Sequence, residues 1–378
     1  MNEIADDRSL RVCLLATHFA EYGYALAQAL ARRCRVFVVA SEENTRMEIG
    51  RDFIAGGFGG QASHLLYRTR NPVSIARQAF ALVRAVRRFA PDVIHAQEDS
   101  KDVLALALPF LPPRPLVLTM HDPKPHEGAD AAAQKRTRHG LYIAQLRRRA
   151  DAAIVHGQRL AGDARAALGR PAVGIHVLAH GPLGERLAGA QGAAPEPGRC
   201  LFFGRIEAYK GLDSFIAAIE GLNAAGIAAR GVVAGRGSAL EPYRAQLTAS
   251  PHFELIDEFL SPERAVREFQ RAEAVLMPYR EATQSGVAAF AMGVGRPVVA
   301  FDVGALRESV RDGETGLLVP PGDLAAFVQA TARVLGDAAL RQRLGTGALA
   351  LGRGALSWDT IADATLAVYR GLAGTPAA

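Results

Sequence analysis

The sequence predicts an α/β protein built from two Rossmann-like domains, each a parallel sheet covered by helices, that face each other across a cleft. Short apolar runs alternate with stretches of helical periodicity, which is the pattern of repeated strand–helix units. The pattern pauses at residues 189–198 and then starts again. The length of 378 residues also fits two domains, because a typical domain holds about 100–200 residues.

The first half contains six apolar runs that predict buried strands and three segments that predict helices. The expected strands are 10–16, 35–40, 93–96, 116–120, 152–155 and 174–178, and the expected helices are 22–33, 74–89 and 133–149. In the helix at 74–89, the apolar residues recur at helical spacing on one face, as expected for a helix that packs on a sheet.

The stretch GAQGAAPEPG at 189–198 is the best candidate for a linker, because glycine and proline break regular structure. We expect a first domain at 1–190 and a second at 196–357, with 358–378 crossing back onto the first. In the second domain the expected strands are 200–203, 231–234, 253–256, 274–277, 297–300 and 317–319. The expected helices are 212–224, 239–247, 262–271, 286–292 and 324–335, followed by a last one at 358–372.

Composition favours a globular protein of a reducing compartment. Hydrophobic residues make up 49% and charged residues 22% of the chain, and the three cysteines are far apart, which argues against disulfides and zinc. Residues 1–9 contain no apolar run, and prolines interrupt the longest apolar stretch at 103–118. We therefore expect no membrane-spanning segment and a cytoplasmic location. A second possibility within this prediction is peripheral attachment at the inner face of the membrane.

Positive charge is concentrated in the first half, where residues 1–195 carry a net charge of +8 against −2 for the rest. Arg84, Arg87 and Arg88 form one cluster, and 147–149 form another. Such clusters are either a solvated arginine-rich face or a surface for anionic membranes. Nucleic acid is not an expected partner, because aromatic residues near the clusters are sparse.

The first chemical motif is FFGRIEAYKG at 202–211. A strand ends at Gly204, and Arg205 and Lys210 follow on the loop before the next helix. Ligands of parallel sheets bind at the carboxyl ends of the strands, and two cations there can neutralise a diphosphate. The alternative is that both are ordinary surface cations.

Two further loops follow strands in the second domain. AGRGS at 234–238 supplies Gly235 and Gly237, which either let the backbone approach a ligand or simply form a tight turn. MPYREATQSG at 277–286 leads into a helix, so that the backbone N–H groups of 283–286 suit a pyrophosphate, and Glu281 suits a sugar hydroxyl. The alternative is a helix start capped by Ser285.

These motifs, together with GRPVVAFDVGALRESVRDGETGLLVPPGD at 295–323, resemble in order and spacing the C-terminal domain of glycosyltransferase family 4, which has the GT-B fold. PDVIHAQ at 91–97, LVLTMHD at 116–122 and VLAHG at 177–181 resemble its N-terminal strand segments more loosely. SWDTIADATLAVYRGL at 357–372 resembles its final helix.

The resemblance implies a retaining glycosyltransferase that moves a sugar from a UDP- or GDP-sugar to a glycan or lipid-linked acceptor. The residues expected to act in catalysis are His121, Arg205, Lys210 and Glu281. Those expected to bind the donor are Gly204, Arg205, Lys210, Gly235, Gly237, Glu281, Thr283, Gln284, Ser285 and Gly286. Those expected on the acceptor side are His18, Gly23, His95 and Asp122. No metal or other cofactor is expected, because there is no Asp-x-Asp motif and the cations can replace a metal.

The sequence departs from the family pattern in two places. Phe290 occupies the position where the family carries a second glutamate, which is associated with the nucleotide ribose, and Glu281 matches the first only approximately. The loop at 18–23 has one glycine where many members have two. Two alternatives therefore stay open: a catalytically silent nucleotide-sugar-binding protein, and another enzyme on a similar scaffold, a sugar-nucleotide epimerase or a phosphorylase.

Overall fold

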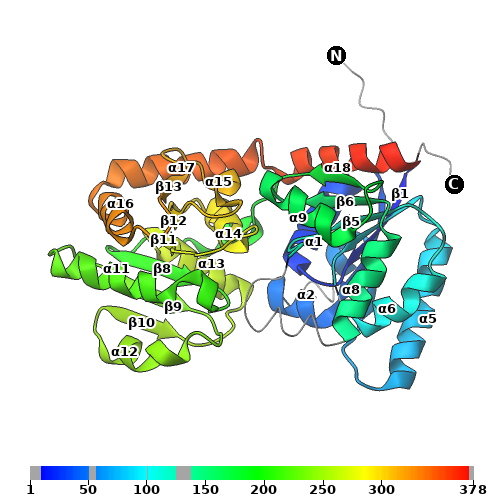
Figure 1. The fold of residues 1–378 in the computed structure, drawn as a ribbon, viewed down its shortest axis with the longest axis horizontal. Helices are drawn as coiled ribbons and strands as arrows, with labels where there is room; N and C mark the ends of the chain where they lie inside the picture. The colour runs from blue at the N-terminus through cyan, green and yellow to red at the C-terminus, as the bar shows by residue number, and fades with distance from the viewer. Residues whose placement is uncertain (1–9, 51–56, 100, 125–137, 374–378) are drawn as a thin grey trace, which may run out of the picture. The chain divides into compact units, whose positions relative to one another are not determined.

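The computed structural model describes residues 10–50, 57–99, 101–124 and 138–373. The contacts within it divide the chain into two compact units. The first unit consists of the chain up to Ala179 together with the part that begins at Trp358, and the second unit is His180–Ser357. Each unit is described by itself below (Figure 1).

The first unit is a seven-stranded parallel sheet in the order β3-β2-β1-β4-β5-β6-β7. Its strands are β1 (Arg11–Ala16), β2 (Arg35–Ser41), β3 (Ala62–Leu66), β4 (Val93–Gln97), β5 (Leu116–Thr119), β6 (Ala152–Val155) and β7 (Gly174–Val177). The strand order reverses between β1 and β4, which is the position where doubly wound sheets bind ligands.

Helices cover both faces of this sheet, and the sequence of β1 shows why. Val12 and Leu14 enter the core on one face, while Cys13 and Leu15 enter the core on the other, because side chains alternate along a strand. The helices are α1 (Ala20–Ala31), α2 (Glu42–Glu48), α4 (Gly57–Gly60), α5 (Pro72–Phe89), α6 (Asp102–Ala107), the 3-10 turn η1 (Leu108–Phe110), α8 (Arg138–Arg149), α9 (Gln158–Leu168) and α18 (Trp358–Ala373). The last packs on α1 (Figure 1).

The second unit repeats the same plan with six parallel strands in the order β10-β9-β8-β11-β12-β13. They are β8 (Arg199–Phe203), β9 (Arg230–Ala234), β10 (Phe253–Ile256), β11 (Ala274–Met277), β12 (Val298–Phe301) and β13 (Gly316–Val319). The order reverses between β8 and β11, so the loops that follow these two strands meet at one edge of the sheet.

The helical elements of the second unit surround a single apolar core. They are α10 (Glu185–Gln191), η2 (Ala208–Lys210), α11 (Leu212–Ala224), η3 (Glu241–Tyr243), α12 (Arg244–Ala249), α13 (Pro262–Arg271), α14 (Gly286–Val294), α15 (Leu306–Ser309), α16 (Leu324–Gly336) and α17 (Ala338–Arg353). Side chains of Ser261, Ser285, Asp323 and Asp337 each accept a backbone N–H at a helix start, which is the expected role of these residue types.

The α/β prediction with two parallel sheets is confirmed, and two of the elements that sequence reasoning missed, β3 and α17, have weak patterns. β3 is a half-exposed edge strand without an apolar run. α17 carries glycines that lower helix propensity, yet Cβ atoms on Gly345 and Gly347 would lie 2.5 and 2.1 Å from the backbone oxygens of Gly295 and Glu314. These glycines therefore allow close packing within the unit.

Several expectations differ in detail from the structure. The unit boundary lies at Ala179–His180, and α10 extends into the stretch at 189–198 that was expected to be a linker. The helix expected at 239–247 is a 3-10 turn followed by the short α12. Residues 1–9, 133–137 and 374–378, which carried parts of other expectations, lie outside the described residues.

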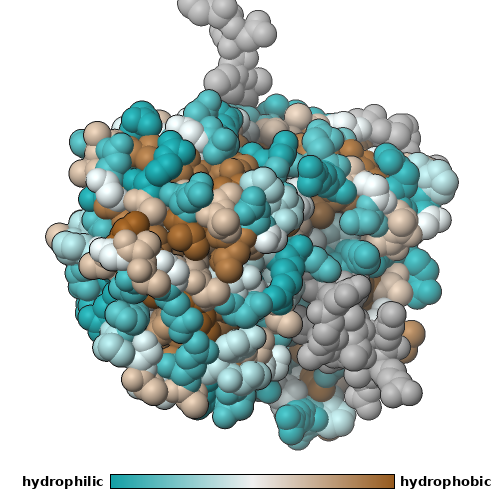
Figure 2. Space-filling model, turned by 60° about the vertical axis from the view of Figure 1, so that its left-hand side comes forward, coloured by the Kyte–Doolittle hydropathy of each residue, from teal (hydrophilic) through white to brown (hydrophobic). Residues whose placement is uncertain are grey.

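No helix in the described part of the chain is long and apolar enough to cross a membrane. Figure 2 shows one face of the molecule, on which hydrophilic side chains surround smaller apolar patches. Cys13, Cys34 and Cys200 are all buried as free thiols.

Candidate active site

The predicted donor residues of the second unit gather where its strand order reverses. Gly204 and Arg205 follow β8, Gly235 follows β9, and residues 281–286 follow β11. Two contacts tie the β11 loop to η2: Arg280 donates its backbone N–H to Tyr209 O at 2.7 Å, and its side chain to Ala208 O at 3.1 Å. The motifs recognised separately in the sequence are therefore parts of one loop cluster.

Lys210 is the most unusual charged residue of this cluster, because only 6% of its surface is exposed. Its Nζ donates to the carbonyl oxygen of Phe203 at 3.2 Å and lies 5.5 Å from the ring centre of Tyr279. Burial lowers the pKa of the Lys210 ammonium, the nearby charge of Arg205 adds to this and Glu207 opposes it, and the result is a pKa of about 7. No carboxylate of the described residues forms an ion pair with it, so a bound anion would stabilise the charged form.

Arg205 is exposed at the surface of the same loop. The positive charge of Arg205 contributes to lowering the pKa of Lys210. Two like charges on one short loop repel each other, and a diphosphate between them would relieve that repulsion. The pair is thus suited to bind an anionic ligand.

The glycines of the first two loops have a packing role that the sequence left open. A Cβ on Gly235 would lie 2.0 Å from Gly204 O, and one on Gly237 would lie 2.1 Å from Ile206 O. The same loops are joined by a hydrogen bond from Ile206 N to Arg236 O at 2.8 Å. Contact between the β8 and β9 loops therefore accounts for both glycines without a ligand.

The start of α14 combines the two interpretations of the third loop. Ser285 caps the helix by accepting from Ala288 N at 3.3 Å, and it hydrogen-bonds Tyr279, whose pKa burial raises. Thr283 is buried and Gln284 is half-buried with its Oε1 lacking a hydrogen-bond partner in the described structure. A Cβ on Gly286 would meet nothing closer than 3.9 Å. The positive end of α14 therefore lies beside a buried acceptor group that has no hydrogen-bond partner in the described structure.

Glu281 is exposed on this loop. Phe290 lies further along the sequence, within α14, and is half-buried in an aromatic group. Its ring centre lies 6.3 Å from that of Phe203 and 5.2 Å from that of Phe269. The position of the family's second glutamate is therefore part of the core packing.

In the first unit, His121 follows β5 and is 2% exposed. Its ring centre lies 4.1 Å from that of Phe19, 4.9 Å from Tyr22 and 5.0 Å from His156. The ring centre of His18 lies 4.2 Å from that of Phe19, with the two rings tilted by 49°, and Phe19 has a left-handed backbone with φ 49°. Sequence reasoning missed this aromatic shell, although the position of His156 directly after β6 was a usable signal.

Among the other residues expected on the acceptor side, His95 and Gly23 take part in packing, and Asp122 lies beside an ion pair. His95 is fully buried, with Nδ1 2.6 Å from Tyr369 Oη and Nε2 2.7 Å from Thr119 Oγ1, and burial lowers its pKa to about 3. These contacts give His95 a structural role that joins β4, β5 and α18. A Cβ on Gly23 would lie 2.5 Å from Ala16 Cβ, so Gly23 lets α1 approach β1.

Asp122 lies next to an ion pair that the sequence did not predict. Arg147 binds Glu98 through two hydrogen bonds of 2.6 and 2.9 Å and also donates to Pro123 O. Burial raises the pKa of Glu98, Arg147 lowers it, and the charge of Asp122 raises it again. This group lies at the carboxyl ends of β4 and β5, beside the position where the strand order reverses.

No three His, Cys, Asp or Glu side chains of the described ranges lie close enough together to hold a metal ion.

Comparison with protein families then identifies the chain. The family model described as glycosyl transferases group 1 matches residues 197–337, and the model described as glycosyltransferase family 4 matches residues 20–181. The protein belongs to the family 4, group 1 glycosyltransferases.

Relatives of this glycosyltransferase agree with that assignment. It is 28% identical over 290 residues to a glycogen synthase of Mycobacterium tuberculosis, covering 75% of this chain and 69% of the relative. It is 31% identical over 172 residues to the alpha-D-kanosaminyltransferase of Streptomyces kanamyceticus, covering 45% of each. It is 41% identical over 111 residues, 29% of this chain and 24% of the relative, to a D-inositol 3-phosphate glycosyltransferase of Nocardioides.

Solved structures show the same fold. Sucrose-phosphate synthase of Thermosynechococcus elongatus superposes with a TM-score of 0.67 at 20% identity, covering 96% of this chain and 99% of that one. Anabaena HepE, in a complex with UDP-glucose, has a TM-score of 0.68 at 17% identity, covering 96% and 100%. The glycosyltransferase therefore has the GT-B fold.

Proposed function

We propose that this glycosyltransferase transfers a hexose, with retention of configuration, from a UDP- or GDP-sugar to an acceptor used in polysaccharide or glycolipid synthesis. The observation that carries the proposal is Lys210, a buried ammonium without a carboxylate partner in the described structure, beside Arg205. A nucleoside diphosphate supplies the missing negative charge. HepE, which shares the fold, binds UDP-glucose, and this supports the donor class.

The chemistry required is the departure of a diphosphate from the anomeric carbon while an acceptor hydroxyl bonds to that carbon and loses its proton. Negative charge grows on the leaving oxygen as the bond breaks. Lys210 and Arg205 are proposed to stabilise it, together with the N–H groups at the start of α14, because fixed donors and charges in a dry site act strongly on developing charge. His121 is proposed as a polar contact to the transferred sugar, and Glu281 as a contact to a sugar hydroxyl.

We also propose that no metal is needed, since the two cations take the place that a divalent ion holds in Asp-x-Asp enzymes. Turnover should be unchanged by EDTA and not increased by Mg²⁺ or Mn²⁺. Activity that disappears with EDTA and returns with either ion would contradict this part of the proposal.

Two other functions remain to be separated by experiment. A silent nucleotide-sugar-binding protein is favoured by Phe290, which replaces an acidic residue of the family. An epimerase or phosphorylase would change the sugar nucleotide or consume phosphate without a glycosyl acceptor.

The test begins with a panel of nucleotide sugars in a thermal-shift assay, since a ligand at 100 times its Kd stabilises the fold by about 2.7 kcal/mol. The donor that stabilises is then incubated with candidate acceptors, and release of nucleoside diphosphate is measured. Release that requires an acceptor identifies a transferase. Binding without release under any acceptor indicates a silent protein, and conversion of the donor alone indicates an epimerase.

A further inference from the structure

One exposed helix face of the first unit combines arginine with large apolar side chains. Val73, Arg77, Phe80, Arg84 and Arg87 follow each other on α5 at intervals of four, three, four and three residues, so they lie on one face of the helix. All five are exposed, and 71% of the surface of Phe80 is open to solvent. The helix carries four arginines, with Arg88 as the fourth, and no aspartate or glutamate.

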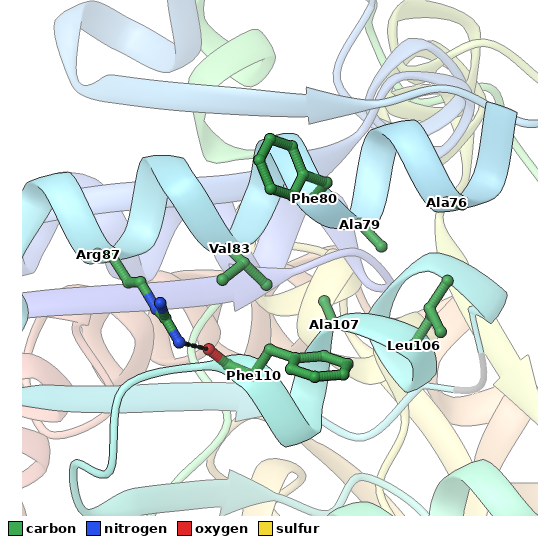
Figure 3. Close-up of a pocket in the computed structure, with 8 residues that line it drawn as sticks. All are labelled: Ala76, Ala79, Phe80, Val83, Arg87, Leu106, Ala107 and Phe110. Carbon is green, nitrogen blue, oxygen red and sulfur yellow. Dashed lines mark hydrogen bonds between the residues drawn. The ribbon is translucent and has the colours of Figure 1, made fainter. Parts of the chain in front are cut away.

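An apolar groove runs beside this face. It lies between α5 and the segment formed by α6 and η1, and its volume is about 340 Å³. Leu106 and Phe110 on its far side are 44% and 58% exposed. Figure 3 shows Ala79 and Val83 of α5 pointing toward the side of the groove formed by Ala107 and Phe110, with Arg87 hydrogen-bonded to the carbonyl oxygen of Phe110. The exposed face of α5 together with Leu106 and Phe110 is called the α5–α6 surface below.

The charges of this surface are not used within the protein. Arg77, Arg84 and Arg88 form no ion pair with any described residue, and Arg87 bonds only a neutral carbonyl. In the second basic cluster of the sequence, by contrast, Arg147 binds Glu98 and Arg149 binds Asp151. The structure thus separates two clusters that look alike in the sequence: the one on α8 is partly neutralised, and the one on α5 is available.

We propose that the α5–α6 surface docks this protein on an anionic lipid bilayer. The arginines contact headgroup phosphates, while Phe80, Phe110 and Leu106 enter the interfacial region, and the groove between them takes up acyl-chain segments. A basic helix face that also carries aromatic and aliphatic residues has the chemistry of interfacial binding. A protein partner is the alternative occupant of this surface, and the vesicle and dimer measurements below distinguish the two.

The inference goes beyond the proposed function, because it concerns where the enzyme works and does not depend on the donor site. It favours an acceptor that resides at a membrane, such as a lipid-linked glycan, over one free in solution.

The proposal is tested by sedimentation with phosphatidylcholine vesicles that contain or lack phosphatidylglycerol. The protein should bind the anionic vesicles, and salt above about 0.1 M should weaken binding, because charges are screened within about 10 Å at that concentration. Arg84→Gln should lower the partition coefficient about fivefold, which corresponds to about 1 kcal/mol for one arginine near the surface. Phe80→Ser should lower it at least about tenfold, also in high salt, since it removes apolar burial.

Matched controls come from the second unit. Phe259 is 63% exposed, and Arg343 is exposed without an ion pair in the described structure, so Phe259→Ser and Arg343→Gln should leave vesicle binding unchanged. Donor turnover with a water-soluble acceptor should be the same in Phe80→Ser and wild type, which keeps this test separate from the proposed function.

Three results would overturn the proposal. One is equal binding to neutral and anionic vesicles, or none to either at low salt. Another is that the control variants weaken binding as much as Phe80→Ser and Arg84→Gln do. The third is a concentration-dependent dimer that Phe80→Ser disperses while vesicles bind nothing, because the surface would then be a protein interface.

Discussion

Lys210 donates a hydrogen bond to the backbone carbonyl oxygen of Phe203 across 3.2 Å, from a position that no described carboxylate neutralises. The ammonium is held by a neutral dipole and an aromatic face, which compensate for its desolvation only in part. As a result its pKa falls to about 7. Lys210 is therefore mostly charged below that pH and mostly neutral above it as long as no anion is bound, whereas Arg205 stays charged.

Donor affinity should therefore depend on pH through Lys210. Bound diphosphate keeps the lysine protonated, so binding takes up a proton once the pH exceeds about 7. Affinity for a nucleotide sugar should then fall by up to about tenfold per pH unit. Titration calorimetry between pH 6 and pH 9 measures the effect, and a nucleotide sugar is the right probe because its diphosphate does not titrate in this range.

Two variants of the same residue separate charge from packing. Lys210→Arg keeps its charge at every pH and should give a flat profile wherever it still binds. Lys210→Met should bind donor weakly at all pH values, while its unliganded fold is at least as stable as wild type, because a buried charge has been removed. A sloped profile that persists in Lys210→Met would assign the titration to another group.

Arg205→Ala should lower turnover on the order of 10² to 10³-fold, the usual effect of losing one group that stabilises charge in the transition state. Because Arg205 is exposed, the free energy of unfolding should change by less than about 0.5 kcal/mol. Arg230→Ala, at the opposite end of the same sheet, is the matched control. Equal turnover in the Arg205 and Arg230 variants would remove Arg205 from the phosphate site.

The loop cluster of the second unit could be predicted because its information is local. Each motif follows a buried strand, and parallel strands bring their carboxyl ends to one edge. The shell around His121 could not be predicted in this way. Phe19, Tyr22 and His156 reach it from α1 and from the end of β6, and no local pattern encodes contacts between such distant segments. The same limit hid the use of His95 and Gly23 in packing.

Phe290 and Gly184 form a pair that only the structure reveals. A Cβ on Gly184 would lie 2.7 Å from Phe290 Cε1, and the backbone of Gly184 has φ 75°. Gly184→Ala should destabilise the second unit by about 1–2 kcal/mol from the left-handed backbone alone, and by more from the collision. In a Phe290→Leu background, only the part of this cost that comes from the collision should disappear.

A double-mutant cycle measured by urea unfolding checks this pair. The costs of Gly184→Ala and Phe290→Leu should be non-additive by about 0.5–3 kcal/mol, with the double variant more stable than the sum predicts. Strict additivity would mean that the ring moves aside freely, and that the aromatic group around Phe290 is loosely packed.

His95 should make the first unit sensitive to acid. Its pKa is about 3 in the fold and about 6.5 in an unfolded chain, so between these values the unfolded state binds more protons than the folded one. The stability that neutral His95 contributes is therefore complete above pH 6.5 and is lost as the pH falls toward 3. The slope attributable to this residue reaches at most about 1.4 kcal/mol per pH unit. His95→Gln keeps groups that can bond Tyr369 and Thr119 but cannot titrate. Its free energy of unfolding, measured by urea titration from pH 7 to pH 5, should fall less steeply than that of wild type. The difference between the two slopes should approach the value for one titrating proton, about 1.4 kcal/mol per pH unit. Parallel slopes in the two proteins would show that acid acts elsewhere, with His180 as the next residue to replace, since burial lowers its pKa to about 4.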